Sequence, residues 1–181
     1  MEYENNDIEI GPARPGDERG IAAVHKETWI KTYPNPAAGF SKSDVLSMAK
    51  DFDSPESIES WKDKIFTNGE NQNYVCAARD RDKVVAFCCA KKFENYNQLS
   101  AIYILPQYQG RGIGKRLFAN VRGWLGREKK IIVTPVAYNL PAIGFYEKMG
   151  FAVIKGKSSA KKMPGGRTMP LIEMELMLSA I

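Results

Sequence analysis

Histidine and cysteine are scarce in this sequence of 181 residues, which contains one histidine and three cysteines. Cys76, Cys88 and Cys89 are odd in number, occur in strand-like sequence and have no metal-ligand spacing with His25. The scarcity argues against a metal site, and we expect no bound metal. The thiols are expected to be buried and free, as in a reducing cytoplasm.

Long apolar runs are also lacking, since none approaches the roughly 20 residues that a membrane helix needs. The first residues, MEYENNDIEI, are acidic and polar, whereas a signal peptide has a basic start and an apolar stretch. No repeat or linker divides the chain. We therefore expect residues 1–181 to form a single cytoplasmic domain without a membrane partner.

The net charge of +5 is distributed unevenly. Residues 1–70 contain 14 Asp and Glu against 8 Lys and Arg, whereas residues 71–181 contain 7 against 18. This asymmetry favours an anionic ligand on one part and a cationic ligand on the other, with two solvated faces as the plainer alternative. Because the basic residues are spread over several elements without a recognition motif, we expect no nucleic-acid partner.

Hydrophobic periodicity predicts an α/β fold, a mixed central sheet flanked by helices on both faces. Asp17 is predicted to cap the first helix, which extends to about Tyr33. The predicted order is β-α-α-α-β-β-β-α-β-α-β-β, with a basic loop over Gly156–Arg167. The predicted strands are 8–10, 74–79, 84–93, 99–105, 131–137, 151–155 and 171–178, and the further helices are about 43–50, 54–68, 112–127 and 141–149.

A glycine-rich turn at 110–114 joins a strand directly to a helix. Gly110, Gly112 and Gly114 let the backbone approach a ligand, and the first N–H groups of a helix have no internal partners. With the helix dipole, the turn predicts a pyrophosphate-binding site. It lacks the Ser or Thr of a P-loop and the spacing of a dinucleotide fingerprint; a turn without ligand is the alternative. Nearby basic residues add positive charge: Arg111, Lys115 and Arg116.

Two motifs give this region a specific resemblance. Residues 109–114, QGRGIG, match Q/R-x-x-G-x-G/A, and residues 139–151, NLPAIGFYEKMGF, match N-x-x-A-x-x-F-Y-x-x-x-G-F. Over about 84–155 the sequence therefore resembles the GNAT superfamily of N-acetyltransferases. The resemblance implies the GNAT fold, acetyl-CoA as co-substrate and a small amine as acceptor.

The resemblance also implies which residues bind acetyl-CoA. Main-chain groups around Ile102 and Ile104 would pair with the pantetheine arm, and the N–H near Ile104 would polarise the thioester carbonyl. Backbone N–H groups of 110–115 would hold the pyrophosphate, and Asn139 would meet the pantetheine or the thioester. The implied set is Ile102, Ile104, Gln109, Gly110, Arg111, Gly112, Ile113, Gly114, Lys115 and Asn139.

Tyr146 falls on the tyrosine that protonates the departing thiolate in this superfamily, although a core tyrosine is the structural alternative. A phenol of pKa about 10 placed beside a thiolate, whose thiol has a pKa of about 8.5, can give it a proton at a modest energetic cost. Relatives often carry a Glu base where this chain has Gln98, which cannot accept a proton. Glu94 and Glu27 are therefore the candidate bases, directly or through water, and His25 is expected to be structural.

The acceptor is predicted from a shorter resemblance. Trp29, Thr32 and Tyr33 resemble the W-x-x-T-Y segment of PaiA-type polyamine acetyltransferases, so Trp29 and Tyr33 are predicted to bind the acceptor. Spermidine or spermine is favoured, because a polycation suits aromatic faces and the acidic N-terminal part. The alternatives are a protein or peptide amino group, a smaller amine or antibiotic, or an acetyl-CoA-binding module without turnover. The oligomeric state stays open, with a homodimer among the alternatives.

Overall fold

In the computed structural model, which describes residues 8–70, 72–163 and 166–177, the chain folds around a mixed sheet of seven strands. The strands are β1 (Ile8–Pro12), β2 (Asn73–Asp80), β3 (Lys83–Lys92), β4 (Asn97–Ile104), β5 (Ile131–Val133), β6 (Ala152–Lys162) and β7 (Thr168–Leu176). The helices are α1 (Glu18–Thr32), α2 (Lys42–Ala49), α3 (Pro55–Phe66), α4 (Ile113–Leu125) and α5 (Leu140–Lys148). The predicted element order and fold class are confirmed.

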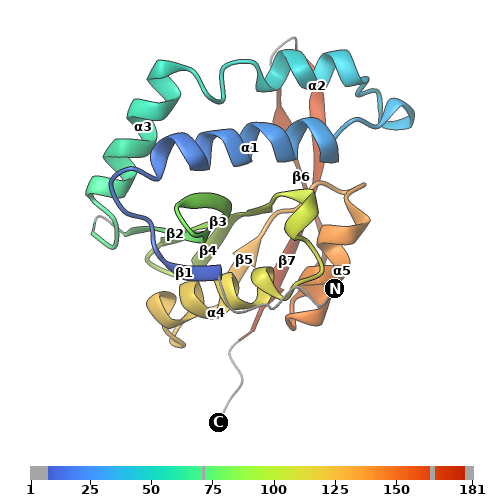
Figure 1. The fold of residues 1–181 in the computed structure, drawn as a ribbon. Helices are drawn as coiled ribbons and strands as arrows, with labels where there is room; N and C mark the ends of the chain where they lie inside the picture. The colour runs from blue at the N-terminus through green and yellow to red at the C-terminus, as the bar shows by residue number, and fades with distance from the viewer. Residues whose placement is uncertain (1–7, 71, 164–165, 178–181) are drawn as a thin grey trace.

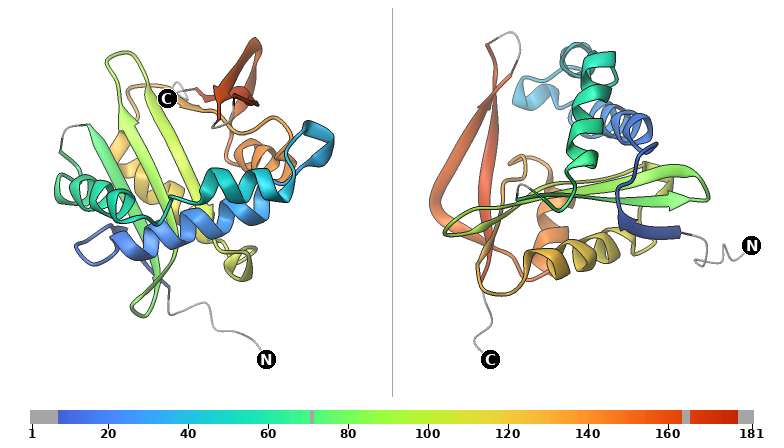
Figure 2. Two further views of the ribbon diagram at one scale, coloured as in Figure 1. Left: turned by 90° about the horizontal axis from the view of Figure 1, so that it is seen from above. Right: turned by 90° about the vertical axis from the view of Figure 1, so that its left-hand side faces the viewer.

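The sheet has the strand order β1-β2-β3-β4-β5-β7-β6 and is covered on both faces. Helices α1, α2 and α3 lie over one face, while α4 and α5 lie on the other, as Figure 1 and the right-hand view of Figure 2 show. Strands β2 and β3 are buried along nearly their whole length because helices cover them from both sides. In the described part of the chain, no helix combines the length and the hydropathy needed to cross a membrane.

Helix α4 carries the glycine-rich turn at its start and is fixed to the sheet by one apolar face. Ile113, Leu117, Val121 and Leu125 recur at helical spacing and are all buried. The helix ends before Gly126, whose φ of +79° favours glycine. The position of the turn is therefore determined by the packing of α4 against the core.

Asp17 precedes α1 as predicted, but its side chain does not cap the helix. Instead, the carboxylate pairs with the guanidinium of Arg79 on β2, accepting a hydrogen bond from Nε at 2.9 Å. Arg79 also donates to the carbonyl of Pro12 at 3.0 Å. The pair is buried, with Arg79 1% exposed, and it connects the start of α1 to β1 and β2. The competing ion pair explains why the capping prediction was wrong.

Two predicted boundaries were wrong near the C-terminus. Strand β5 ends at Val133 and not at 137, since Thr134-Pro135 follows and proline cannot donate in a sheet. The predicted loop over Gly156–Arg167 is instead mostly strand β6, which extends to Lys162 at the edge of the sheet. Nearly all of β6 is exposed on both faces, so no alternation of apolar and polar residues marks it as a strand.

The sheet opens between β4 and β5. These two strands are parallel and pair only from Asn97–Ile131 to Leu99–Val133. Beyond this point β4 continues to Ile104 paired with β3, whereas the chain after β5 turns away and meets β7 at Val136. The register shows a bulge in β4 at the same place: Ala101 lies opposite Cys89 and Leu99 opposite Ala90, so Ser100 is the extra residue.

Candidate active site

A cavity of about 870 Å³ occupies the opening between β4 and the segment after β5. It is lined from one side of the sheet by α1 residues and from the other by residues of α4 and α5. Because those helices cover opposite faces (Figure 1), the cavity passes through the plane of the sheet. A ligand could therefore enter from one face and meet a second ligand from the other.

The glycine turn forms one end of this cavity. Gly110 and Gly112 line it with φ values of +77° and +74°, and a Cβ added at either would meet no protein atom within 4 Å. No side chain caps α4, whose first described helical bond runs from the Arg116 N–H to the Gly112 carbonyl at 3.2 Å. The N–H groups of residues 113–115 precede that bond, as an anion-binding helix start requires. The turn therefore fits a pyrophosphate.

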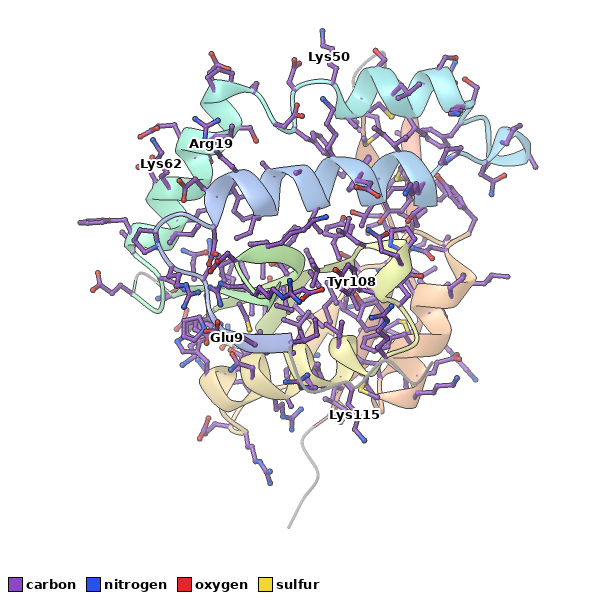
Figure 3. All side chains as sticks on the ribbon, viewed as in Figure 1. Glu9, Arg19, Lys50, Lys62, Tyr108 and Lys115 are labelled. Atoms are coloured by element: carbon purple, nitrogen blue, oxygen red, sulfur yellow. The ribbon has the colours of Figure 1, made fainter. Side chains whose placement is uncertain are left out.

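Two side chains hold the turn in place. Gln109 Nε2 donates to the carbonyl of Ile104 at 3.1 Å, which joins the turn to the end of β4. The Tyr108 hydroxyl donates to the Asp80 carboxylate at 2.7 Å. Figure 3 labels Tyr108 together with Lys115, a cation of α4 that lines the cavity. The conformation of the turn thus rests on both β2 and β4.

Most of the predicted cofactor residues line the cavity, while Arg111 and the side chain of Ile113 do not. Arg111 does not line the cavity; its guanidinium lies 5.1 Å from the centre of the Tyr108 ring. Ile113 is buried in the core, and Arg116, expected to add charge, donates to the carbonyl of Ile8 at 2.8 Å. The residues of the set that line the cavity are Ile102, Ile104, Gln109, Gly110, Gly112, Gly114, Lys115 and Asn139.

Gly114 is needed for packing more than for ligand approach. A Cβ there would lie 3.0 Å from the ring of Phe145 and 3.2 Å from Ile104. The glycine therefore lets α4 approach α5 and β4 closely. Asn139 caps α5, its side-chain oxygen accepting from the Ala142 N–H at 3.3 Å.

Tyr146 lies on α5 with its side chain buried at the cavity wall. Its ring contacts those of Phe145 and Phe151, with centroids 5.4 and 5.6 Å away. Burial raises the pKa of its hydroxyl well above the usual value, and the neighbouring Cys88 and Tyr33 raise it further. The phenol is therefore fully protonated at neutral pH.

The far end of the cavity is aromatic. The indole N–H of Trp29 donates to the Tyr103 hydroxyl at 2.9 Å, and the rings of Trp29 and Tyr33 lie 4.6 Å apart. The Tyr138 hydroxyl donates to the carbonyl of Tyr33 at 3.2 Å. Burial raises the pKa of the Tyr33 hydroxyl, and proximity to Tyr103 adds to the shift. The four rings form a fixed, uncharged surface around the space opposite the glycine turn.

The charged residues of the cavity are all basic. Among the described lining residues, Lys31, Lys115, Lys148 and Lys161 carry charge, and none is Asp, Glu or His. Lys31 is paired with Glu27 at 2.7 Å. The acidic N-terminal part of the sequence thus brings no carboxylate into this lining.

Neither candidate base lines the cavity. Glu27 borders a separate hollow with Lys26 and Asp53, while Glu94 is exposed in the turn between β3 and β4. Gln98, which stands where relatives carry a Glu, is also outside the lining. The two carboxylates therefore remain sequence predictions that this geometry does not support.

His25 lies behind the aromatic end and not at the cavity surface. Its imidazole stacks on Phe52 at 4.3 Å between centroids and lies 5.1 Å from the Tyr103 ring. Burial lowers its pKa from 6.5 to about 4, with the positive charges of Lys161 and Lys64 adding to the shift. The ring is therefore neutral at pH 7 and supports the residues that form the wall.

Several lining residues were missed from the sequence. Pro135, directly after an apolar run, was a signal that the strand ends and the chain turns away. Apart from Phe145, which stands in the motif at 139–151, no local signal marks the others, because they come from separate helices, strands and loops that only the fold brings together. They include Thr28, Lys31, Ser100, Tyr103, Thr134, Tyr138, Phe145, Lys161, Met169 and Leu171.

Comparison with known proteins agrees with this geometry. Residues 42–151 match the Acetyltransferase (GNAT) family, while no curated protein matches the chain significantly. The PaiA N-acetyltransferase from Thermoplasma acidophilum, in complex with coenzyme A, is 22% identical over 94% of this chain and 98% of its own, with a TM-score of 0.72.

Two further solved structures share the fold. YncA from Salmonella typhimurium, described as a possible acetyltransferase and solved with acetyl-CoA, is 17% identical over 97% of this chain and 96% of its own, with a TM-score of 0.67. The ribosomal-protein-S18-alanine N-acetyltransferase from Escherichia coli is 20% identical over 96% of both chains, with a TM-score of 0.60.

Proposed function

The chain belongs to the acetyltransferase (GNAT) family, and we propose that it transfers the acetyl group of acetyl-CoA directly to a primary amine, with Tyr146 as general acid. One observation carries the proposal. A single cavity runs through the sheet from the glycine turn to the aromatic end, and Tyr146 lies on its wall. Such a cavity lets the two substrates meet without a covalent enzyme intermediate.

The donor end would hold acetyl-CoA largely through the main chain. The N–H groups of residues 113–115 suit the pyrophosphate, and the edge of β4 at Ile102–Ile104 suits the amide-containing pantetheine arm. When bound, acetyl-CoA supplies an activated acyl thioester. Lys115 adds positive charge where phosphate would lie.

Tyr146 would complete the transfer. The acceptor nitrogen forms a bond to the acetyl carbon, the carbon–sulfur bond breaks, and the thiolate takes the phenolic proton. The amine releases its own proton to solvent, from which the phenol recovers one. The buried hydroxyl is protonated before the reaction, as an acid must be.

The acceptor must reach the site as a neutral amine. An alkyl amine of pKa about 10.4 is neutral in only about one molecule in 2,500 at pH 7. The described lining offers no carboxylate or imidazole to remove the proton, but its lysines disfavour a charged ammonium and lower the pKa of a bound amine. We infer that deprotonation occurs through water.

Two acceptor classes have support. Two observations favour a polyamine. The segment containing Trp29, Thr32 and Tyr33 lines the cavity, and the PaiA structure has a similar fold. A protein or peptide amino group is the second candidate, since a similar fold serves the S18-alanine N-acetyltransferase. The basic lining favours the second, because a polycation would meet lysines and no carboxylate.

The test is a screen of acetyl-CoA consumption across polyamines, aminoglycosides, amino acids and peptides with free amino termini. We expect turnover with at least one class and mass addition of one acetyl group on the amine. Tight acetyl-CoA binding without turnover of any amine would contradict the enzyme proposal and support a non-catalytic module.

A further inference from the structure

Lys161 differs from the other cations of the cavity in its place beside Trp29. It lies on β6 directly opposite Met169 of β7, and both side chains line the cavity near Trp29. Its ammonium lies 5.6 Å from the centre of the Trp29 ring. No carboxylate of the described residues pairs with it, whereas the charge of Lys31 on the same side is compensated by Glu27. Lys161 thus leaves an unpaired positive charge at the aromatic end.

This charge lies beside Trp29, whereas the glycine turn lies at the start of α4. Lys161 and Trp29 line the cavity from β6 and α1, while Gly112 and Lys115 line it from the start of α4. The right-hand view of Figure 2 shows α1 and α4 on opposite faces of the sheet. A cation beside the acceptor has two effects. It attracts an anionic group, and it repels a second ammonium.

We propose that the acceptor is a small primary amine that also carries a carboxylate, and that Lys161 pairs with this carboxylate. The inference rests on the proposed amine acetylation and specifies its substrate class. The chemistry is shared by free amino acids and by short peptides with an acidic residue. An α-amino group of a peptide has a pKa of about 7.7–8.0, so it also needs less help with deprotonation than an alkyl amine.

The experiment measures kcat/KM for matched acceptors. The dipeptide amides Gly-Glu-NH₂ and Gly-Gln-NH₂ share one α-amino group and differ in a single carboxylate, and spermidine represents the polycations. Free glutamate is measured separately, and kcat/KM is calculated from the concentration of the neutral amine. We expect the wild type to prefer Gly-Glu-NH₂ over Gly-Gln-NH₂ by about tenfold, as for a hydrogen bond to a charged group. Preference for free glutamate over the dipeptide would identify the amino acid as the source.

Two variants assign the preference to the side chain. Lys161→Met should reduce the ratio to about one and Lys161→Glu should invert it, with the acetyl-CoA affinity unchanged. Lys162→Glu is the matched control, because the neighbouring strand residue points to the other face and carries the same charge change. Faster turnover of spermidine than of either dipeptide, or an equal ratio in Lys161→Met and wild type, would overturn this inference. Turnover of no amine would instead contradict the proposed function.

Discussion

The two ends of the cavity differ in whether main-chain or side-chain groups line them. The donor end consists mainly of main chain from one stretch of sequence, from Ile102 to the start of α4, and its glycines are left-handed where a ligand must approach. The aromatic end, where we propose that the acceptor binds, consists of side chains from α1, β4, β6 and β7 that only the fold brings together; we call it the acceptor end. A backbone site tolerates one ligand geometry, whereas a side-chain site can change its specificity through single substitutions.

The largest effect is expected at the donor end. Gly112→Val should weaken acetyl-CoA binding by about 3–6 kcal/mol, because the side chain enters the cavity and displaces hydrogen bonds to a charged phosphate. Calorimetric titration with acetyl-CoA measures the change. Gly39→Val is the control, since Gly39 has a similar φ of +82° and does not line the cavity. Unchanged affinity in the Gly112 variant would remove the pyrophosphate assignment.

The folding stability should fall in acid because of His25, which packs behind the acceptor end. In the unfolded chain the imidazole binds a proton below about pH 6.5, but in the folded chain only below about pH 4. Between these values the unfolded chain binds more protons, so stability falls as the pH falls. The loss should approach about 3 kcal/mol at pH 4.

Urea unfolding of wild type and His25→Phe at pH 6.5 and pH 4 tests this expectation. The phenyl ring keeps the stack on Phe52 and cannot titrate, so the variant should lose less stability between the two pH values. The remaining titratable groups change the folding stability of both proteins by the same amount. The same loss in both would mean that His25 is not the source.

We expect the proposed reaction to depend on Tyr146, which lies on the cavity wall. Tyr146→Phe keeps the ring packing and removes the proton, so kcat should fall by about 10²-fold while the acetyl-CoA affinity stays nearly constant. Steady-state kinetics with a saturating acceptor separates the two quantities. An unchanged kcat would make Tyr146 a core residue only.

The same contrast explains what the sequence could predict. The motifs at 109–114 and 139–151 are continuous, so they indicated the cofactor residues, Tyr146 and the fold class. The motif does not show where each side chain points: the Ile113 side chain is buried in the core although its N–H belongs to the helix start, and Arg116, just beyond the motif, donates to the Ile8 carbonyl.

The acceptor end was predicted less completely. A short resemblance predicts Trp29 and Tyr33 as acceptor residues, and both line the cavity. Lys161 falls in a predicted loop, because β6 is exposed and lacks apolar alternation. The acidic N-terminal composition suggested carboxylates at the acceptor, yet Glu27 pairs with Lys31 and does not line the cavity. Net charge over 70 residues does not determine the charge of a cavity lined by a few of them.

The smallest effect is expected at Trp29, and it tests whether acceptor binding and acetyl-CoA binding are independent of each other. Trp29→Phe removes the indole N–H that donates to the Tyr103 hydroxyl but keeps an aromatic face beside Tyr33. The lost hydrogen bond corresponds to about 1 kcal/mol, so the acceptor KM should rise roughly fivefold.

Trp124→Phe is the control, because Trp124 stacks on Tyr74 outside the cavity. The dissociation constant for acetyl-CoA, measured without acceptor, should be the same in both variants. If Trp29→Phe weakened acetyl-CoA binding as much as acceptor binding, the two ends would be energetically coupled through Tyr103 and β4, and the division into a main-chain donor site and a side-chain acceptor site would be wrong.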